Sequence, residues 1–141
     1  MPFKILEDIA TADVAFEATG KTIEEMFKSA ALAVSSIMVK LDTIEHVAKK
    51  EIEMSEKDVE TLLVRFLNEI IFIKDAELLL FSKYHIGIKK NSKYTLKADM
   101  FGDKIDMDKQ TLGVDVKAVT YHMLEVKQEE GIWKARIILD I

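Results

Sequence analysis

The sequence predicts an α+β fold, in which two long helices and one short helix pack on an antiparallel or mixed sheet. Two segments repeat apolar residues at steps of three and four, as amphipathic helices do. Most of the remaining chain alternates apolar and polar residues, as strands do. These strands follow one another mostly as hairpins, which favours antiparallel pairing with helices on one face. The expected order is approximately β-α-β-α-β-β-α-β-β, in a single domain over residues 1–141.

The first strand and the first helix lie near the start of the chain. In "DVAFEAT", Val14, Phe16 and Ala18 share one face, which we expect to be buried. Thr22 and Glu25, three residues apart, form a capping box that begins the helix. The helix then repeats apolar residues at Ile23, Met26, Phe27, Ala30, Val34, Ile37, Met38 and Leu41.

The second helix is expected to begin at "SEKD", where Ser55 can cap it and Asp58 suits its positive N-terminal end. Its apolar stripe consists of Val59, Leu62, Leu63, Phe66, Leu67, Ile70 and Ile73. Ile71 and Phe72 widen this stripe, which predicts that the helix is covered on more than one side.

The remaining strands are placed by the turns between them. "KKEIEM" is polar enough for an edge strand. "KNSK" separates "YHIGIKK" from "YTLKADMFG", and "EEG" separates "HMLEVKQ" from "IWKARIILD", so both pairs are predicted to be hairpins. "GVDVKAVTYH", between the two hairpins, is expected to form the short helix.

The composition excludes several classes of protein. The chain has 141 residues, a net charge of −5 and no cysteine, so it has no disulfide and no thiolate metal site. Its lysines are scattered among acids, so protein partners or cations suit it better than direct contact with nucleic acid. It shows neither a signal-peptide pattern nor a run of the roughly 18 apolar residues that cross a bilayer. We therefore expect no membrane association and a cytoplasmic location.

No standard catalytic or nucleotide-binding motif is present. "TGKT" at 19–22 lacks the upstream glycine of a phosphate loop and is interpreted as a strand-to-helix turn. His46 and His85 are interpreted as ordinary surface or packed histidines, whereas the role of His122 stays open. No pair of histidines has the spacing of a metal site on one helix.

Two aspartates at strand ends are more informative. Asp13 begins the first clear strand, out of phase with its apolar face, and Asp140 ends the last strand on its less apolar side. If these strands are neighbours, the two carboxylates converge. Ile141 adds the carboxylate of the chain terminus, and three like charges would repel one another unless a cation is bound. Oxygen ligands alone favour a hard divalent cation such as calcium or magnesium.

Four segments resemble signatures of the archease family, in the right order and over nearly the whole chain. They are "TADVAFEATGKTIEEMFKSAALAVSSIM", "VETLLVRFLNEIIFIKDAELLLFSK", "VKAVTYHMLEV" and the final "WKARIILDI". One position departs from the family, which usually has histidine immediately before T-A-D, where this chain has Ala10. Asp8 is the nearest polar residue that could take over a role of that histidine.

The resemblance implies a function. Archeases are accessory proteins of the GTP-dependent tRNA-splicing RNA ligase; they promote its guanylylation and multiple turnover without being ligases themselves. The family's cation site corresponds to Asp13, Asp140 and Ile141. Lys117 and His122 in "VKAVTYH" are candidates for contact with the ligase. Asp75 in "KDAE" is a third candidate contact, although it can also be a residue of the helix end.

Two alternatives remain open from the sequence alone. A broad chaperone or modulator of nucleic-acid enzymes would need an exposed apolar patch. A stand-alone metal-dependent hydrolase would need an open cation site and a general base, for which only His122 is available.

Overall fold

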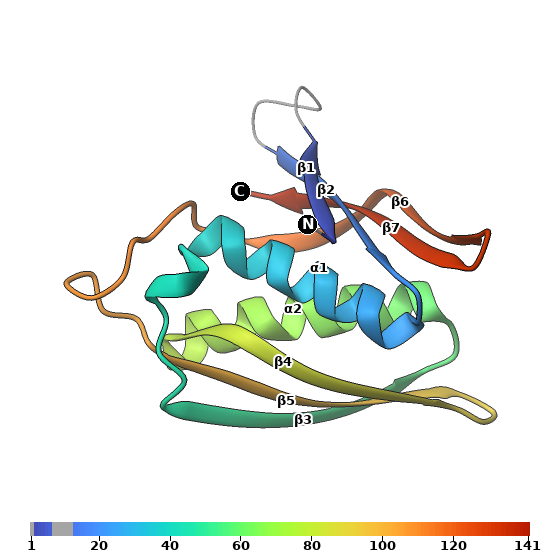
Figure 1. Ribbon diagram of the computed structural model, residues 1–141, viewed down its shortest axis with the longest axis horizontal. Helices are drawn as coiled ribbons and strands as arrows, with labels where there is room; N and C mark the ends of the chain where they lie inside the picture. Colours follow the sequence, from blue (N-terminus) through green and yellow to red (C-terminus); the bar gives the residue numbers. More distant parts are fainter. Residues whose placement is uncertain (1, 7–12) are drawn as a thin grey trace.

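The computed structural model describes residues 2–6 and 13–141 of the chain. Two antiparallel sheets lie one above the other, with two long helices between them (Figure 1). One sheet has the strand order β1-β2-β7-β6, and the other has the order β3-β5-β4. The elements are β1 (Phe3–Leu6), β2 (Asp13–Gly20), α1 (Ile23–Met38), the 3-10 helix η1 (Leu41–Thr43), β3 (Ala48–Glu56), α2 (Val59–Glu77), β4 (Leu79–Lys90), β5 (Tyr94–Lys104), β6 (Ala118–Glu129) and β7 (Ile132–Asp140).

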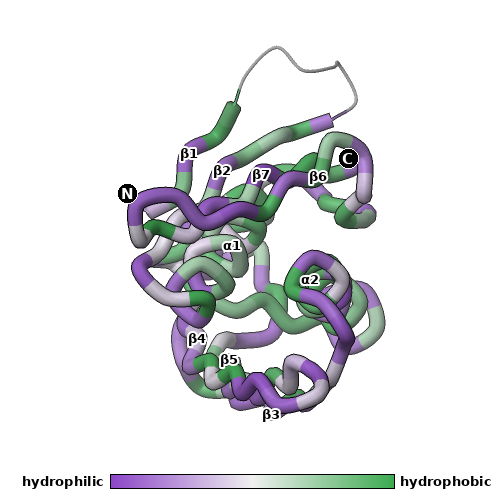
Figure 2. The backbone as a smooth tube through the Cα atoms, turned by 90° about the vertical axis from the view of Figure 1, so that its right-hand side faces the viewer, coloured by the Kyte–Doolittle hydropathy of each residue, from purple (hydrophilic) through white to green (hydrophobic). Residues whose placement is uncertain are grey.

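Both helices bury their apolar faces between the two sheets. Helix α1 contacts β2 on one side and β4 on the other, and α2 contacts β6 and β3. Figure 2 shows the two helices enclosed between the sheets in the view from the side. Each sheet therefore has one face on the helices and one face toward solvent, which is why its strands alternate apolar and polar residues.

Helix α1 begins as its sequence predicts. The Thr22 side chain accepts a hydrogen bond from the amide of Glu25, and the Glu25 carboxylate accepts one from the amide of Lys21. "TGKT" is thus a turn between a strand and a helix: Gly20 ends β2, and its missing Cβ leaves room for the backbone of the first helical turn. The amides of Lys21 and Glu25 at this helix start are thus satisfied by neighbouring side chains.

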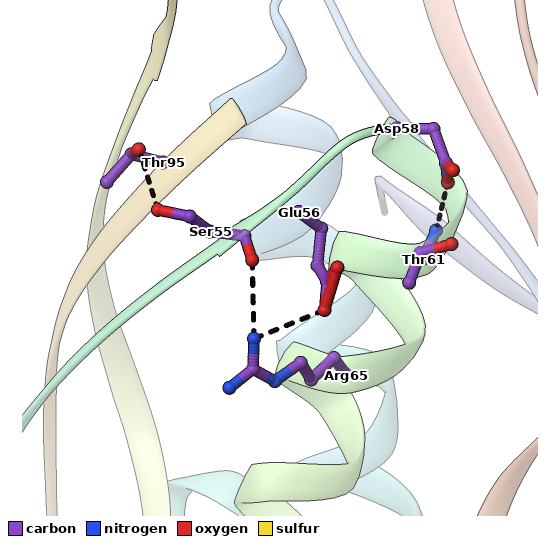
Figure 3. A network of polar contacts seen from close by, with 6 residues as sticks. All are labelled: Ser55, Glu56, Asp58, Thr61, Arg65 and Thr95. Carbon is purple, nitrogen blue, oxygen red and sulfur yellow. Dashed lines mark hydrogen bonds and ion pairs between the residues drawn. The ribbon is translucent and has the colours of Figure 1, made fainter. Parts of the chain in front are cut away.

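The start of α2 differs from its prediction (Figure 3). Asp58, not Ser55, caps the helix, because its side chain accepts a hydrogen bond from the amide of Thr61. Ser55 lies in β3 and bonds across the sheet to Thr95, so its hydroxyl is unavailable. Arg65 joins the two elements through the Ser55 carbonyl and the Glu56 carboxylate.

The predicted stripe of α2 is buried, and so is Ile71. Phe72 is the exception: its side chain is 60% exposed, so the prediction that it widens the covered face is wrong. It shares the outer face of the helix with the exposed Arg65, about two turns earlier, where no sheet lies.

The α+β class, the antiparallel pairing, both hairpins and the polar edge strand β3 are confirmed. The predicted short helix in "GVDVKAVTYH" is wrong, because residues from Ala118 onward pair with β7 as a strand. The short helix of the described chain is η1 instead. The strands also form two sheets rather than one, with β1 as an additional edge strand.

Two residues discussed for the sequence, Asp8 and Ala10, lie outside the described residues. Within the described part, no helix combines the length and apolar character needed to cross a membrane.

Candidate metal site and partner surface

The candidate metal site lies where β2 begins and β7 ends. These two strands are neighbours in the four-stranded sheet, and their antiparallel register places Asp13 directly opposite Asp140. Along β2, Asp13 shares one face with Glu17, and these residues alternate with the core residues Phe16 and Ala18 on the other face. Both aspartates therefore belong to the face that looks away from the helices, and the pairing of their strands, on which the expected convergence depends, is observed.

The two carboxylates face each other without a protein cation between them. Side chains of directly opposed residues in an antiparallel pair have Cβ atoms about 4.5–5.5 Å apart. Asp140 is exposed and Asp13 is half-buried. Among the described residues, neither carboxylate makes an ion pair or a side-chain hydrogen bond. Like charges that oppose each other across a sheet are destabilising, so this pair would gain from a bound cation.

Lys117 lies beside this pair. Its backbone N–H donates to the carbonyl oxygen of Asp140 at 2.8 Å, and the next residue, Ala118, is paired directly with Asp140. Lys117 is exposed and belongs to extended chain rather than to the expected short helix. Asp13, Asp140 and Ala118 thus lie side by side across the end of the sheet, and Lys117 precedes Ala118 in the chain.

A buried lysine holds the segment that carries Lys117. The side chain of Lys74, near the end of α2, is only 7% exposed and donates to the carbonyl of Val116 at 2.8 Å. It also pairs with Asp115 and, at 3.1 Å, with Asp75. A buried ammonium needs such partners to remain charged. The predicted contact residue Asp75 therefore has a structural role, although its carboxylate is exposed enough to meet a partner as well.

A second tie holds the edge strand β6 to α2. The Asn68 side chain accepts from the amide of Val119 at 2.8 Å and donates to the carbonyl of the same residue at 3.3 Å. Sequence reasoning missed Asn68 and Lys74 as positioning residues. The available signal was a polar side chain inside the apolar repeat of a helix, which is costly unless it has a partner.

The three histidines do not come together. His46 is exposed and shares a hydrogen bond of 2.7 Å with Ser82, and His85 is exposed with its ring against Phe101. His122 is exposed in an irregular part of β6. In the described residues, no group of three or more His, Cys, Asp or Glu side chains could hold a metal ion.

A cation at this site would therefore need donors beyond the two aspartates. Two carboxylates fit a hard ion with oxygen ligands, since calcium takes six to eight oxygens and magnesium keeps several waters. Ile141 is half-buried, with its side chain packed against the core beside Asp140. The role of its carboxylate as a third donor stays a prediction.

Comparisons with known proteins place the chain in a family. The model of the archease protein family matches residues 3–141. Protein archease of Pyrococcus abyssi is 36% identical over 133 residues, which cover 93% of this chain and 94% of the relative. Protein archease of Sulfolobus acidocaldarius is 38% identical over 131 residues, with coverage of 93% and 94%.

Solved structures agree with these relatives. The solution structure of Methanobacterium thermoautotrophicum protein 1598 matches with a TM-score of 0.87 at 36% identity, over 99% of both chains. The crystal structure of an archease from Thermotoga maritima, described as a possible chaperone, matches with a TM-score of 0.65. It is 20% identical and covers 94% of this chain and 93% of that one, a likeness of fold alone.

The fold defines a class of small α+β proteins in which two antiparallel sheets enclose two helices. The chain belongs to the archease family. Membership of this family implies an accessory, partner-binding role.

Proposed function

We propose that this protein is a non-catalytic accessory factor of a tRNA-splicing RNA ligase, promoting GTP-dependent guanylylation of the ligase and its multiple turnover. The observation that carries the proposal is the direct opposition of Asp13 and Asp140, from strands at opposite ends of the chain. Two opposed carboxylates at the exposed end of a sheet, without an ion pair to the described residues, suit presentation of a cation to a partner.

The proposed role of each residue follows from its place. Asp13, Asp140 and the Ile141 carboxylate would hold a calcium- or magnesium-like divalent cation, which when bound supplies positive charge to offset phosphate charge in guanylyl transfer. Because these residues alone do not complete a coordination shell, they leave positions for oxygens of a partner or its nucleotide. Lys117 stands next to the pair, where its ammonium can meet a phosphate.

Electrostatics favour the same kind of partner. The net charge of −5 suits association with an RNA-binding, and therefore basic, ligase, since complementary charge speeds encounter. It does not suit direct binding to RNA. Asp75 and His122 are exposed and remain proposed contacts of the ligase.

The proposal is tested by multiple-turnover RNA ligation with the cognate ligase and GTP, with and without this protein, across a series of divalent cations. We expect the protein to raise both the guanylylated fraction and the number of turnovers. Asp140→Asn should abolish this stimulation and weaken cation binding together. Asp108→Asn, which removes an equal charge from an exposed turn, is the control. Full stimulation by Asp140→Asn with lost cation binding would overturn the proposed mechanism.

Two other functions are distinguished by the same preparations. A general chaperone would suppress aggregation of unrelated proteins without any cation. The strongly exposed apolar residues of the described chain are distributed over separate elements, among them Val47, Phe72, Leu78, Met107 and Tyr121. A stand-alone hydrolase would turn over phosphoesters without the ligase and would lose this activity in Asp13→Asn.

A further inference from the structure

We propose that a bulge in β6, Tyr121 to Leu124, is the docking element by which this protein grips its partner, with Tyr121 and Met123 as apolar anchors. The inference rests on the proposed function, because the partner it names is the RNA ligase. It adds a surface that is separate from the carboxylate pair and that determines the affinity for the ligase rather than the guanylyl transfer.

The bulge is large and conformationally costly. Thr120 is paired with Ile138, and the pairing resumes only at Glu125 with Arg136. Four residues of β6 thus stand opposite the single residue 137 of β7, where a regular ladder would have one. Met123 adopts a left-handed conformation with φ of 53°, which is sterically unfavourable for a residue other than glycine. Bulges that re-aim side chains in this way are concentrated beside functional sites.

The side chains that the bulge turns outward are apolar. Tyr121 is 59% exposed and Met123 is 49% exposed, with the exposed His122 between them. Tyrosine and methionine are enriched at the centres of protein interfaces, where tyrosine supplies rigid area and methionine adapts its shape. Unlike the single exposed apolar residues elsewhere, such as Met107, these two lie two residues apart in one bulge. The residues therefore fit an interface that becomes buried on association.

The surroundings disfavour strand addition next to the bulge. β6 is an edge strand, and its free backbone groups could otherwise extend the sheet into another chain. Asn68 already bonds both the N–H and the carbonyl of Val119, and the bulge interrupts the ladder directly beyond it. At the bulge itself, side chains such as the two apolar anchors are therefore better placed to hold a partner than the backbone is.

The charge near the bulge selects the partner. Tyr121 is three residues along β6 from Ala118, which pairs with Asp140, so it lies about 10 Å from the carboxylate pair at about 3.3 Å per residue. At this end Asp115 is paired with Lys74 and Lys117 is exposed beside Asp140, so with Asp13 and Asp140 the acids outnumber the bases only slightly, in a chain whose net charge is −5. A second copy of the chain would bring like charges together, and nucleic acid would be repelled. An apolar pocket rimmed by basic side chains on the ligase fits both features.

The test compares the concentration of protein that half-saturates ligase stimulation. Tyr121→Ser with Met123→Ser should raise this concentration about 10-fold or more, as for interface anchors, and leave maximal stimulation unchanged. Asp140→Asn, in contrast, should abolish the stimulation itself. The matched control, Val47→Ser with Met107→Ser, removes two strongly exposed apolar side chains from other elements and should change neither.

Each other result is informative. If the bulge variant half-saturates stimulation within twofold of the wild-type concentration, Tyr121 and Met123 have no docking role. If its melting temperature falls by more than a few degrees, their role is structural and the docking role is overturned. If wild type does not stimulate the ligase, the proposed function fails, and direct titration of wild type and variant against the ligase decides docking by itself. Tight binding of a labelled single-stranded RNA that the bulge variant loses would assign the surface to RNA and overturn the protein partner.

Discussion

Replacing Asp140 by asparagine should make the protein more stable without divalent cations and less stable with them. Two unit charges about 6 Å apart repel by about 0.7 kcal/mol in water and by about 2.8 kcal/mol at an effective dielectric constant of about 20. Because Asp140 is exposed, the lower end applies, and Asp140→Asn should gain about 1 kcal/mol in a chelating buffer. A cation at about 100 times its dissociation constant should stabilise wild type by about 2.7 kcal/mol, and the variant should lose most of this.

The assay is unfolding by urea and by heat, in chelator and then in calcium or magnesium. For a chain of this length, each kcal/mol corresponds to about 3–4 °C in melting temperature. The gain of the variant in chelator should shrink as salt increases, because salt screens charges at this separation. Asp108→Asn serves again as the control for a simple change in net charge. If Asp140→Asn is less stable than wild type in chelator, or is stabilised by the cation as much as wild type, the reasoning is refuted.

Three further changes test the fold and the site. Gly102→Ala should destabilise by about 3 kcal/mol or more, since its Cβ would overlap the backbone of β4, whereas Gly87→Ala, with open space around it, should be neutral or slightly stabilising in the same urea titration. Tyr84→Phe should cost about 1 kcal/mol at neutral pH through the lost hydrogen bond to Ser35. Burial raises the pKa of Tyr84, so above about pH 10 the phenol ionises in the unfolded state only, and wild type loses stability as pH rises. The difference in stability between wild type and Tyr84→Phe should therefore shrink above this pH. Adding residues after Ile141 should weaken cation binding in calorimetry if its carboxylate is a donor, while a tag at the other end should not.

The opposition of Asp13 and Asp140 could be predicted in part. Strand parity assigns both to the polar face, but parity says nothing of which strands are neighbours. That relation depends on pairing between residues far apart in sequence, which local pattern does not encode. The resemblance to a family supplied the missing relation, and the register then brought the side chains face to face.

Other features could not be predicted from local patterns. Residues around Thr120 and Met123 resemble a short helix as much as a strand, and only the ladder with β7 decides between them. Lys74 lies in a helix whose apolar repeat it interrupts, and its partner Asp115 is 41 residues further along the chain. The cap of α2 was misplaced by three residues because the hydroxyl of Ser55 is taken by Thr95 in the same sheet.

The strand that comes last along the chain, β7, lies inside its sheet, between β2 and β6. Until β7 has been synthesised, the edge of β2 that will pair with it has no neighbour and can pair with strands of other chains. The opposition of Asp13 and Asp140 cannot form until β7 has been synthesised and has paired with β2. A chain cut before β7 would thus lack both the opposed aspartates and the strand that covers this edge of β2.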